Sequence, residues 1–219
     1  MLALALVSLC LAEVPEGLLP VVDRASIQVV WSEQARAAGA EDEAAVLACQ
    51  PFAEDLVTCF TVPQAAGRRM VTRQDLSAWQ VQLPAVEERA LAGVRGGLTA
   101  ERPQSVQVEG DVRTYLLSAE GDGLDQAALF DPAALQERFA GGAFAVGIPA
   151  RGVLIALPLG DRELETIVAV GVRRLWETVE DPITPALYSW NGDAWVVWGQ
   201  ATPGGAEHQG SDPLARPLD

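Results

Sequence analysis

The sequence lacks most of the residue types on which enzyme chemistry commonly depends. It has no lysine, a single histidine and three cysteines in 219 residues. Without lysine there is no Schiff base and no phosphate-loop lysine. The one histidine, His208, lies in a C-terminal stretch rich in proline and glycine, where a nucleophile and its base are rarely held together. Neither GxGxxG nor GxSxG occurs, so we predict no catalytic residues and no cofactor.

The metal-ligand inventory is equally poor. A structural zinc site needs several cysteine and histidine ligands, and the two cysteines expected in the mature chain, ten residues apart, cannot supply four with the one histidine in the tail. The acidic stretch at residues 118–132 has glycine and glutamate at the wrong spacing for a calcium loop. We therefore predict no metal site.

The charge balance is strongly acidic. Thirty aspartates and glutamates against fifteen arginines give a formal charge of -15. Such a chain repels phosphate backbones and anionic lipid headgroups, so we expect a protein or peptide partner and no nucleic acid. The hydrophobic fraction of 49% and charged fraction of 21% are typical of chains that fold around a core.

The first twelve residues, MLALALVSLCLA, are almost entirely apolar, and the turn-like EVPEG follows them. This run is too short to span a bilayer, and it fits the apolar part of a signal peptide cleaved after Ala12. We predict a periplasmic or extracellular protein without a transmembrane segment in the mature chain. The alternative is a cytoplasmic protein in which these residues form a buried first element.

Cleavage after Ala12 would leave two cysteines, Cys49 and Cys59. An even pair in an oxidising compartment is a disulfide candidate. Two buried thiols that behave as small hydrophobic residues are the alternative.

The element pattern predicts an α+β fold, with a mainly antiparallel sheet and helices packed on it. We expect a β-α-α-β unit over residues 13–66, with a strand at 26–31 and a helix at 41–50, and a disordered tail over residues 201–219.

Residues 67–200 carry clearer signals. A capping box at Thr72 and Asp75 and a helix from residue 84 precede a hairpin around residues 110–111. Helix starts at Asp131 and Asp161 bracket two apolar strands near the centre of the sheet. One apolar stripe of the helix after Asp161 is expected to face the core, and its members are Leu164, Ile167, Val168, Gly171, Val172, Leu175 and Val179.

Two groups of side chains are candidate binding residues. Asp122, Asp125 and Arg151 could act together as a carboxylate site, although Asp122 in a turn and Asp125 as a helix cap explain the same pattern. Tyr188, Trp190 and Trp195 flank the turn of a predicted hairpin and could form an aromatic platform for a sugar or peptide. Packing as the inner face of that hairpin is the alternative.

Several segments between Thr72 and Trp195 resemble the YtpQ-like family of bacterial proteins of unknown function. They are TRQDLSAW, TYLLSAEGDGLDQAALF, FAVGIPARGVLIAL and the hairpin at residues 184–195. The chain departs from the family pattern at Gly152, where aspartate is usual, and at Leu124, where an aromatic residue is common. The resemblance implies a fold of mixed α and β elements, no particular reaction, and a cytoplasmic location.

Three hypotheses for function follow. The first is a non-catalytic interaction module, exported, that receives a protein or peptide. The second is a hydrolase that uses Asp122 and Asp125 on a cell-envelope polymer. The third is a chaperone-like adaptor in the cytoplasm.

Overall fold

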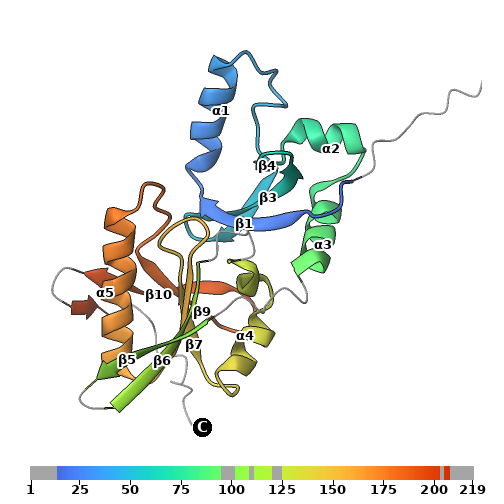
Figure 1. Ribbon diagram of the computed structural model, residues 1–219. Coiled ribbons are helices and arrows are strands. Elements are labelled where there is room, and N and C mark those ends of the chain that lie inside the picture. Colours follow the sequence, from blue (N-terminus) through green and yellow to red (C-terminus); the bar gives the residue numbers. More distant parts are fainter. Residues whose placement is uncertain (1–13, 95–101, 109–110, 120–124, 203–204, 208–219) are drawn as a thin grey trace, which may run out of the picture.

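The computed structural model describes residues 14–94, 102–108, 111–119, 125–202 and 205–207 (Figure 1). The chain has an α+β fold built on two antiparallel sheets. A four-stranded sheet and three helices form the N-terminal unit. Its elements are β1 (Leu19–Arg24), α1 (Ile27–Ala37), β2 (Cys49–Ala53), β3 (Leu56–Gln64), β4 (Gly67–Met70), α2 (Arg73–Trp79) and α3 (Leu83–Val94).

The rest of the described chain is built around a seven-stranded sheet, whose strand order is β11-β10-β9-β7-β8-β6-β5. Its strands are β5 (Arg102–Val108), β6 (Asp111–Ser118), β7 (Phe144–Gly147), β8 (Leu154–Pro158), β9 (Ala186–Trp190), β10 (Trp195–Thr202) and β11 (Gly205–Glu207). The helices between them are a 3-10 turn, η1 (Ala127–Phe130), and two α-helices, α4 (Pro132–Arg138) and α5 (Arg162–Thr178).

Both faces of the larger sheet carry apolar side chains, which is why β7 and β8 read as nearly continuous apolar runs in the sequence. On one face Val146 and Ala156 pack in a core shared with the small sheet, η1 and α4. On the other face Ala145, Ile155 and Leu157 pack against α5. Figure 1 shows α5 on one side of this sheet and the N-terminal unit at its end. The central strands β7 and β8 lie where the sequence predicts them.

The predicted helix starts are confirmed by their capping contacts. The Thr72 side chain accepts from the Asp75 N–H, and the Asp75 carboxylate accepts from the Thr72 N–H, which makes a capping box at α2. Asp131 caps α4, whose first residue is Pro132. Asp161 accepts from the N–H groups of Glu163 and Leu164 at the start of α5.

Three expectations about the ends of the chain are wrong. Residues 27–37, including most of the predicted strand at 26–31, form α1, and the strand lies just before it as β1. The predicted helix at 41–50 is a run of turns that leads into β2. The β-branched residues of IQVVW favour a strand locally, but the strand position beside β3 is taken by the equally apolar residues of β1. At the other end, β10 continues to Thr202 and pairs with β11, so the first residues of the predicted tail are strand, while residues 208–219 of that tail lie outside the described residues.

Candidate functional site

The predicted carboxylate site is only partly described, because Asp122 lies outside the described residues. Asp125 is 1% exposed, and one of its carboxylate oxygens accepts a hydrogen bond of 3.1 Å from the Ser118 hydroxyl. The N-cap position of η1 is Gln126, whose side chain makes no capping hydrogen bond, and the predicted capping role of Asp125 stays a prediction. The Asp125 carboxylate lies beside Ser118 at the end of β6, and a Cβ atom placed on Gly152 would lie 3.4 Å from its Oδ2 atom.

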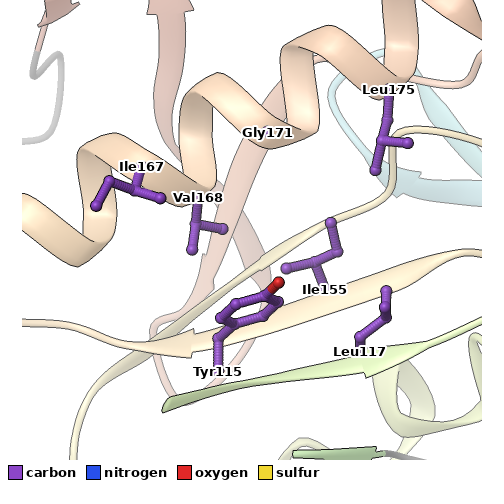
Figure 2. Close-up of a pocket in the computed structure, with 7 residues that line it drawn as sticks. All are labelled: Tyr115, Leu117, Ile155, Ile167, Val168, Gly171 and Leu175. Carbon is purple, nitrogen blue, oxygen red and sulfur yellow. The ribbon is translucent and has the colours of Figure 1, made fainter. Parts of the chain in front are cut away.

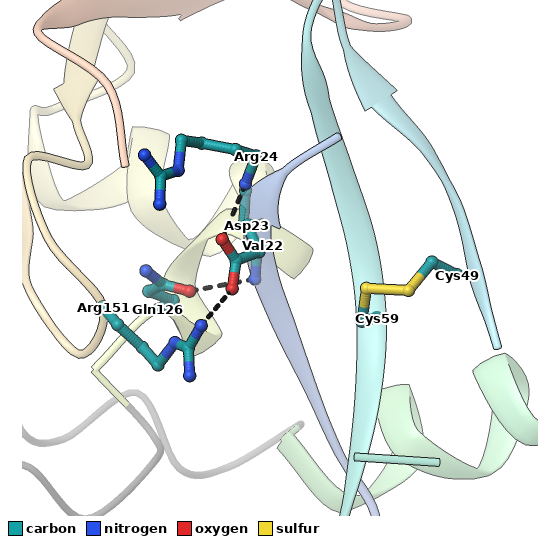
Figure 3. The surroundings of a disulfide bond; sticks show 7 residues. All are labelled: Val22, Asp23, Arg24, Cys49, Cys59, Gln126 and Arg151. Carbon is teal, nitrogen blue, oxygen red and sulfur yellow. Dashed lines mark hydrogen bonds and ion pairs between the residues drawn. A yellow bond between two sulfur atoms is a disulfide. The ribbon is translucent and has the colours of Figure 1, made fainter. Parts of the chain in front are cut away.

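Arg151 holds the two units together. Its guanidinium donates to the Asp23 carboxylate at 2.5 Å, and Asp23 is 1% exposed (Figure 3). The other Asp23 oxygen accepts from the Arg24 N–H at 2.8 Å, and Asp181 lies 3.4 Å from the same guanidinium nitrogen. A buried carboxylate needs such partners, because an unpaired charge out of water is strongly destabilising. Arg151 therefore joins the turn after β7 to β1, and its guanidinium is engaged there.

A second contact fixes the same strand. The Gln126 side-chain carbonyl accepts a hydrogen bond of 2.9 Å from the Val22 N–H, and both residues are buried (Figure 3). Gln126 and Arg151 belong to the part of the chain that carries the larger sheet, and both contact β1. β1 itself pairs with β3 in the small sheet. The region that the sequence singled out around Asp125 and Arg151 is thus the joint between the two sheets.

The three aromatic candidates come together, with their rings packed in the core between the sheets. Trp190 and Trp195 are opposite each other across the hairpin, with ring centroids 5.6 Å apart. Trp195 is 6% exposed and donates its indole N–H to the Leu129 carbonyl at 3.0 Å. Tyr188 is 1% exposed, and burial raises the pKa of its hydroxyl to about 12. Of the three, Trp190 alone is half-exposed, so binding of a ligand by this set stays a prediction.

Cys49 and Cys59 form a disulfide bond between paired positions of β2 and β3 (Figure 3). Cys59 is fully buried, and it packs in a small cluster with Leu47 and Val57. The bridge therefore links the β2 edge strand to the centre of the small sheet. Among the described residues no group of three histidine, cysteine or acidic side chains could hold a metal ion, and no helix is long and apolar enough to cross a membrane.

A groove that sequence reasoning did not identify lies between α5 and the larger sheet (Figure 2). Its volume is about 200 Å³. The floor is made by Tyr115 and Leu117 of β6 and Ile155 of β8, whose side chains point toward the helix. The Tyr115 hydroxyl is the single polar side-chain group among the lining residues.

One side of α5 forms the wall of the groove, with Ile167, Val168, Gly171 and Leu175. Ile167 and Leu175 are 40% and 39% exposed, although both line the groove beside a core. A Cβ atom placed on Gly171 would find no other atom within 4 Å. The wall is therefore an open apolar row with a gap at its centre.

An ion-pair cluster lies at the N-terminal end of α5. The Arg113 guanidinium of β6 contacts the Asp161 carboxylate at 2.5 Å and the Asp111 carboxylate at 3.2 Å. Hydrogen bonds from the Leu164 N–H and from Arg113 hold the pKa of Asp161 below its usual range. These contacts tie the start of α5 to β6, so the helix is held beside the strand that forms the groove floor.

The sequence did contain a signal for this groove. The apolar stripe predicted for α5 is wide, but only its central row, Leu164, Val168 and Val172, is buried. The row of Ile167, Gly171 and Leu175 was expected to face the core, and it faces the groove. The clue in the sequence was the width of the apolar stripe, because a helix that packs on a sheet by one row needs a narrower stripe.

Comparison with known proteins places the chain in no group. No family model, no curated protein sequence and no solved structure matches it. The resemblance to the YtpQ-like family thus stays a prediction from the quoted segments.

Proposed function

We propose that the protein is a non-catalytic interaction module that binds a segment of another protein or a peptide in the groove beside α5. The observation that carries this proposal is the groove itself, with apolar walls, partly exposed Ile167 and Leu175, and a volume of about 200 Å³. Exposed contiguous apolar surface commonly marks a site of protein interaction. A pocket of this size accepts one or two large apolar side chains rather than a whole cofactor.

The other candidate residues lend less support to catalysis. A carboxylate hydrolase needs acids that reach the substrate, whereas Asp125 is buried beneath Ser118 and Gly152. Arg151 is occupied by Asp23. The burial of Asp125 and the pairing of Arg151 with Asp23 therefore favour structural roles for these residues over the hydrolase hypothesis.

We also propose that the protein is exported and that it is related to the YtpQ-like family, and both proposals are independent of the groove. The disulfide between Cys49 and Cys59 is compatible with a periplasmic or extracellular location. Intact-mass measurement of the protein from its native host, with and without reductant, tests the first of these two proposals. A mature chain that begins at Glu13 and gains two hydrogens on reduction supports export, and a full-length chain with free thiols supports the cytoplasmic adaptor.

Selection from a displayed library of random 16-residue peptides tests binding in the groove. Recovered peptides are resynthesised, and their dissociation constants are measured for the wild type, Gly171→Leu and Val170→Leu. The leucine at position 171 fills the gap, whereas Val170 is exposed on the same helix and does not line the groove. We expect Gly171→Leu to weaken binding at least tenfold and Val170→Leu to change it less than twofold. Recovery of no peptide with this dependence would overturn the proposal.

A further inference from the structure

The strand β2 has little backbone pairing. It lies at the edge of the small sheet and pairs, among the described strands, with β3 alone. The Cα atoms of Cys49 and Cys59 are 4.2 Å apart, which is typical of an antiparallel pair without backbone hydrogen bonds. Such pairs alternate with hydrogen-bonded ones, so Pro51 and Val57 form a second pair of the same kind, in keeping with the missing N–H of proline. One hydrogen-bonded pair lies between these two, and the register is irregular beyond Pro51.

Two side-chain links also hold β2 in place. The Gln50 amide donates a hydrogen bond of 2.5 Å to the Glu87 carboxylate of α3. The disulfide joins Cys49 of β2 to Cys59 of β3, as Figure 3 shows. The covalent link therefore acts where the backbone ladder is short.

The residues that follow the bridge on β2 form part of the joint between the two sheets. The Phe52 ring centroid lies 6.0 Å from that of Phe130 and 6.4 Å from that of Trp195. In the turn after β2, the Asp55 carbonyl accepts a hydrogen bond of 2.6 Å from the Ala25 N–H, which comes directly after β1. The position of β2 therefore determines how this part of the joint is filled.

The two sulfurs of the bridge differ in exposure. Cys59 is fully buried in a cluster with Leu47 and Val57, whereas Cys49 is half-exposed. A thiolate that attacks from solvent therefore reaches the Cys49 sulfur and expels Cys59 as a thiolate. That charge would form among apolar side chains, where desolvation disfavours it. Reduction is opposed while β2 is in place, and it becomes easier when β2 moves away from β3 and admits water.

We propose that the Cys49–Cys59 bridge is a redox-sensitive switch that keeps β2 docked and thereby closes the joint between the two sheets. In the oxidised chain β2 holds Phe52 against Trp195 and Phe130. In the reduced chain β2 separates from β3, and Phe52 leaves the joint. The inference does not depend on the groove beside α5, and it goes beyond export because it gives the oxidation of the two cysteines a conformational consequence.

The closing reaction is a thiol–disulfide exchange with an external disulfide. The Cys49 thiolate attacks one sulfur of that oxidant, which forms a mixed disulfide and releases one thiol of the oxidant. The Cys59 thiolate then attacks the Cys49 sulfur, which forms the bridge and releases the second thiol. Two electrons pass from the two cysteines to the oxidant, and their two protons end on its two thiols. A dithiol reductant reverses both steps.

Hydrogen exchange measured by mass spectrometry tests the switch on the full chain, oxidised and after complete reduction with dithiothreitol. We expect peptides that cover residues 49–56 and 22–28 to exchange at least about tenfold faster in the reduced chain, because β2 and the Ala25 N–H lose their partners. Peptides from α5 should change less than about twofold. Unchanged exchange at residues 49–56 would overturn the inference. Equal acceleration throughout would also overturn it, because the bridge would then support the whole fold.

A variant without the bridge separates the switch from other effects of the reductant. The double variant Cys49→Ala, Cys59→Ala should exchange like the reduced wild type at residues 49–56, and dithiothreitol should not change it further. Slow exchange in this variant, like that of the oxidised wild type, would show that β2 stays docked without the bridge and would overturn the inference.

The reverse coupling gives a second test, because two linked equilibria affect each other equally. Phe52→Ala weakens the docking of β2, so dithiothreitol should reduce the bridge at least about fivefold faster than in the wild type. The matched control is Phe139→Ala, which removes a ring of the same core, stacked on Phe144 and not on β2, and should change the rate less than about twofold. Equal rates for Phe52→Ala and the wild type would show that reduction does not require β2 to move, and the switch would be wrong.

Discussion

The two faces of the seven-stranded sheet are built from the same alternating strands but are covered to different extents. On one face Val146, Ala156 and Trp195 lie beneath the small sheet, η1 and α4, and are at most 6% exposed. On the other face α5 covers the central strands and leaves Tyr115 and Leu117 half-exposed. Nearly continuous apolar runs in the central strands thus predict that both faces are apolar, while the number of elements available to cover each face decides which one keeps a groove.

This difference in cover predicts different effects of substitution on the two faces. Side chains on the covered face have few ways to relax when altered, so substitutions there should destabilise the fold. Side chains along the open row contact few neighbours, so substitutions there should leave stability nearly unchanged and affect binding. The predictions below compare these two kinds of position, from the largest expected effect to the smallest.

The largest effect is expected for Trp195→Ala on the covered face. The substitution removes a buried indole that packs edge-on against Phe144, with centroids 5.8 Å apart, and donates to the Leu129 carbonyl. Loss of such a side chain destabilises a protein by about 3–5 kcal/mol. Urea unfolding followed by far-ultraviolet circular dichroism measures it. The matched control is Trp190→Ala, which should cost less because Trp190 is half-exposed. Equal costs would contradict the difference in burial between the two rings.

A smaller loss is expected for Gly147→Ala, under the covered part of α5. A Cβ at this position would lie 2.7 Å from Val172 Cγ2 and 3.0 Å from Leu187 Cδ2. Both neighbours are buried, so they cannot move aside easily, and overpacking of this kind costs about 1–3 kcal/mol. The same unfolding measurement checks it. An unchanged or higher unfolding midpoint would mean that α5 sits less tightly on the sheet than described.

The sequence made the covered regions easier to predict than the groove. Capping at Asp131 and Asp161 and the apolar runs of β7 and β8 are local signals, and the elements follow them. Residues 26–31 were misassigned because β-branched residues favour a strand locally, whereas the choice between β1 and α1 depends on which segment pairs with β3. Arg151 and Asp23 are 128 residues apart in the sequence, so no local pattern predicts their contact. The groove combines β6 with α5, and its one local signal was the wide apolar stripe of the helix. The sequence predicted the Cys49–Cys59 bridge only as one of two alternatives. The register of β2 and β3 is what brings the two residues opposite each other.

Tyr188 provides a pH test of the covered face. Burial raises the pKa of its hydroxyl from the ordinary value near 10 to about 12 in the folded protein. Its contribution to stability is therefore complete below pH 10 and is lost progressively as pH rises toward 12, by about 1 kcal/mol at pH 11. We expect Tyr188→Phe to remove this part of the alkaline loss. The check is the difference in unfolding free energy between pH 8 and pH 11 for both proteins. Identical slopes would indicate that the hydroxyl reaches solvent.

The smallest effect, and the most direct comparison, is the same substitution made on the open row. In Gly171→Ala the new methyl group meets no atom within 4 Å, while the helix gains from the lost flexibility of glycine. Stability should therefore rise by about 0.5–1 kcal/mol, opposite in sign to Gly147→Ala. Parallel urea titrations of the two variants measure both signs. A destabilised Gly171→Ala would show that the gap is already filled by the chain's own atoms. A stabilised one would show that no side chain of the described residues fills the gap at Gly171, in contrast to Gly147, where Val172 and Leu187 leave no room for a methyl group.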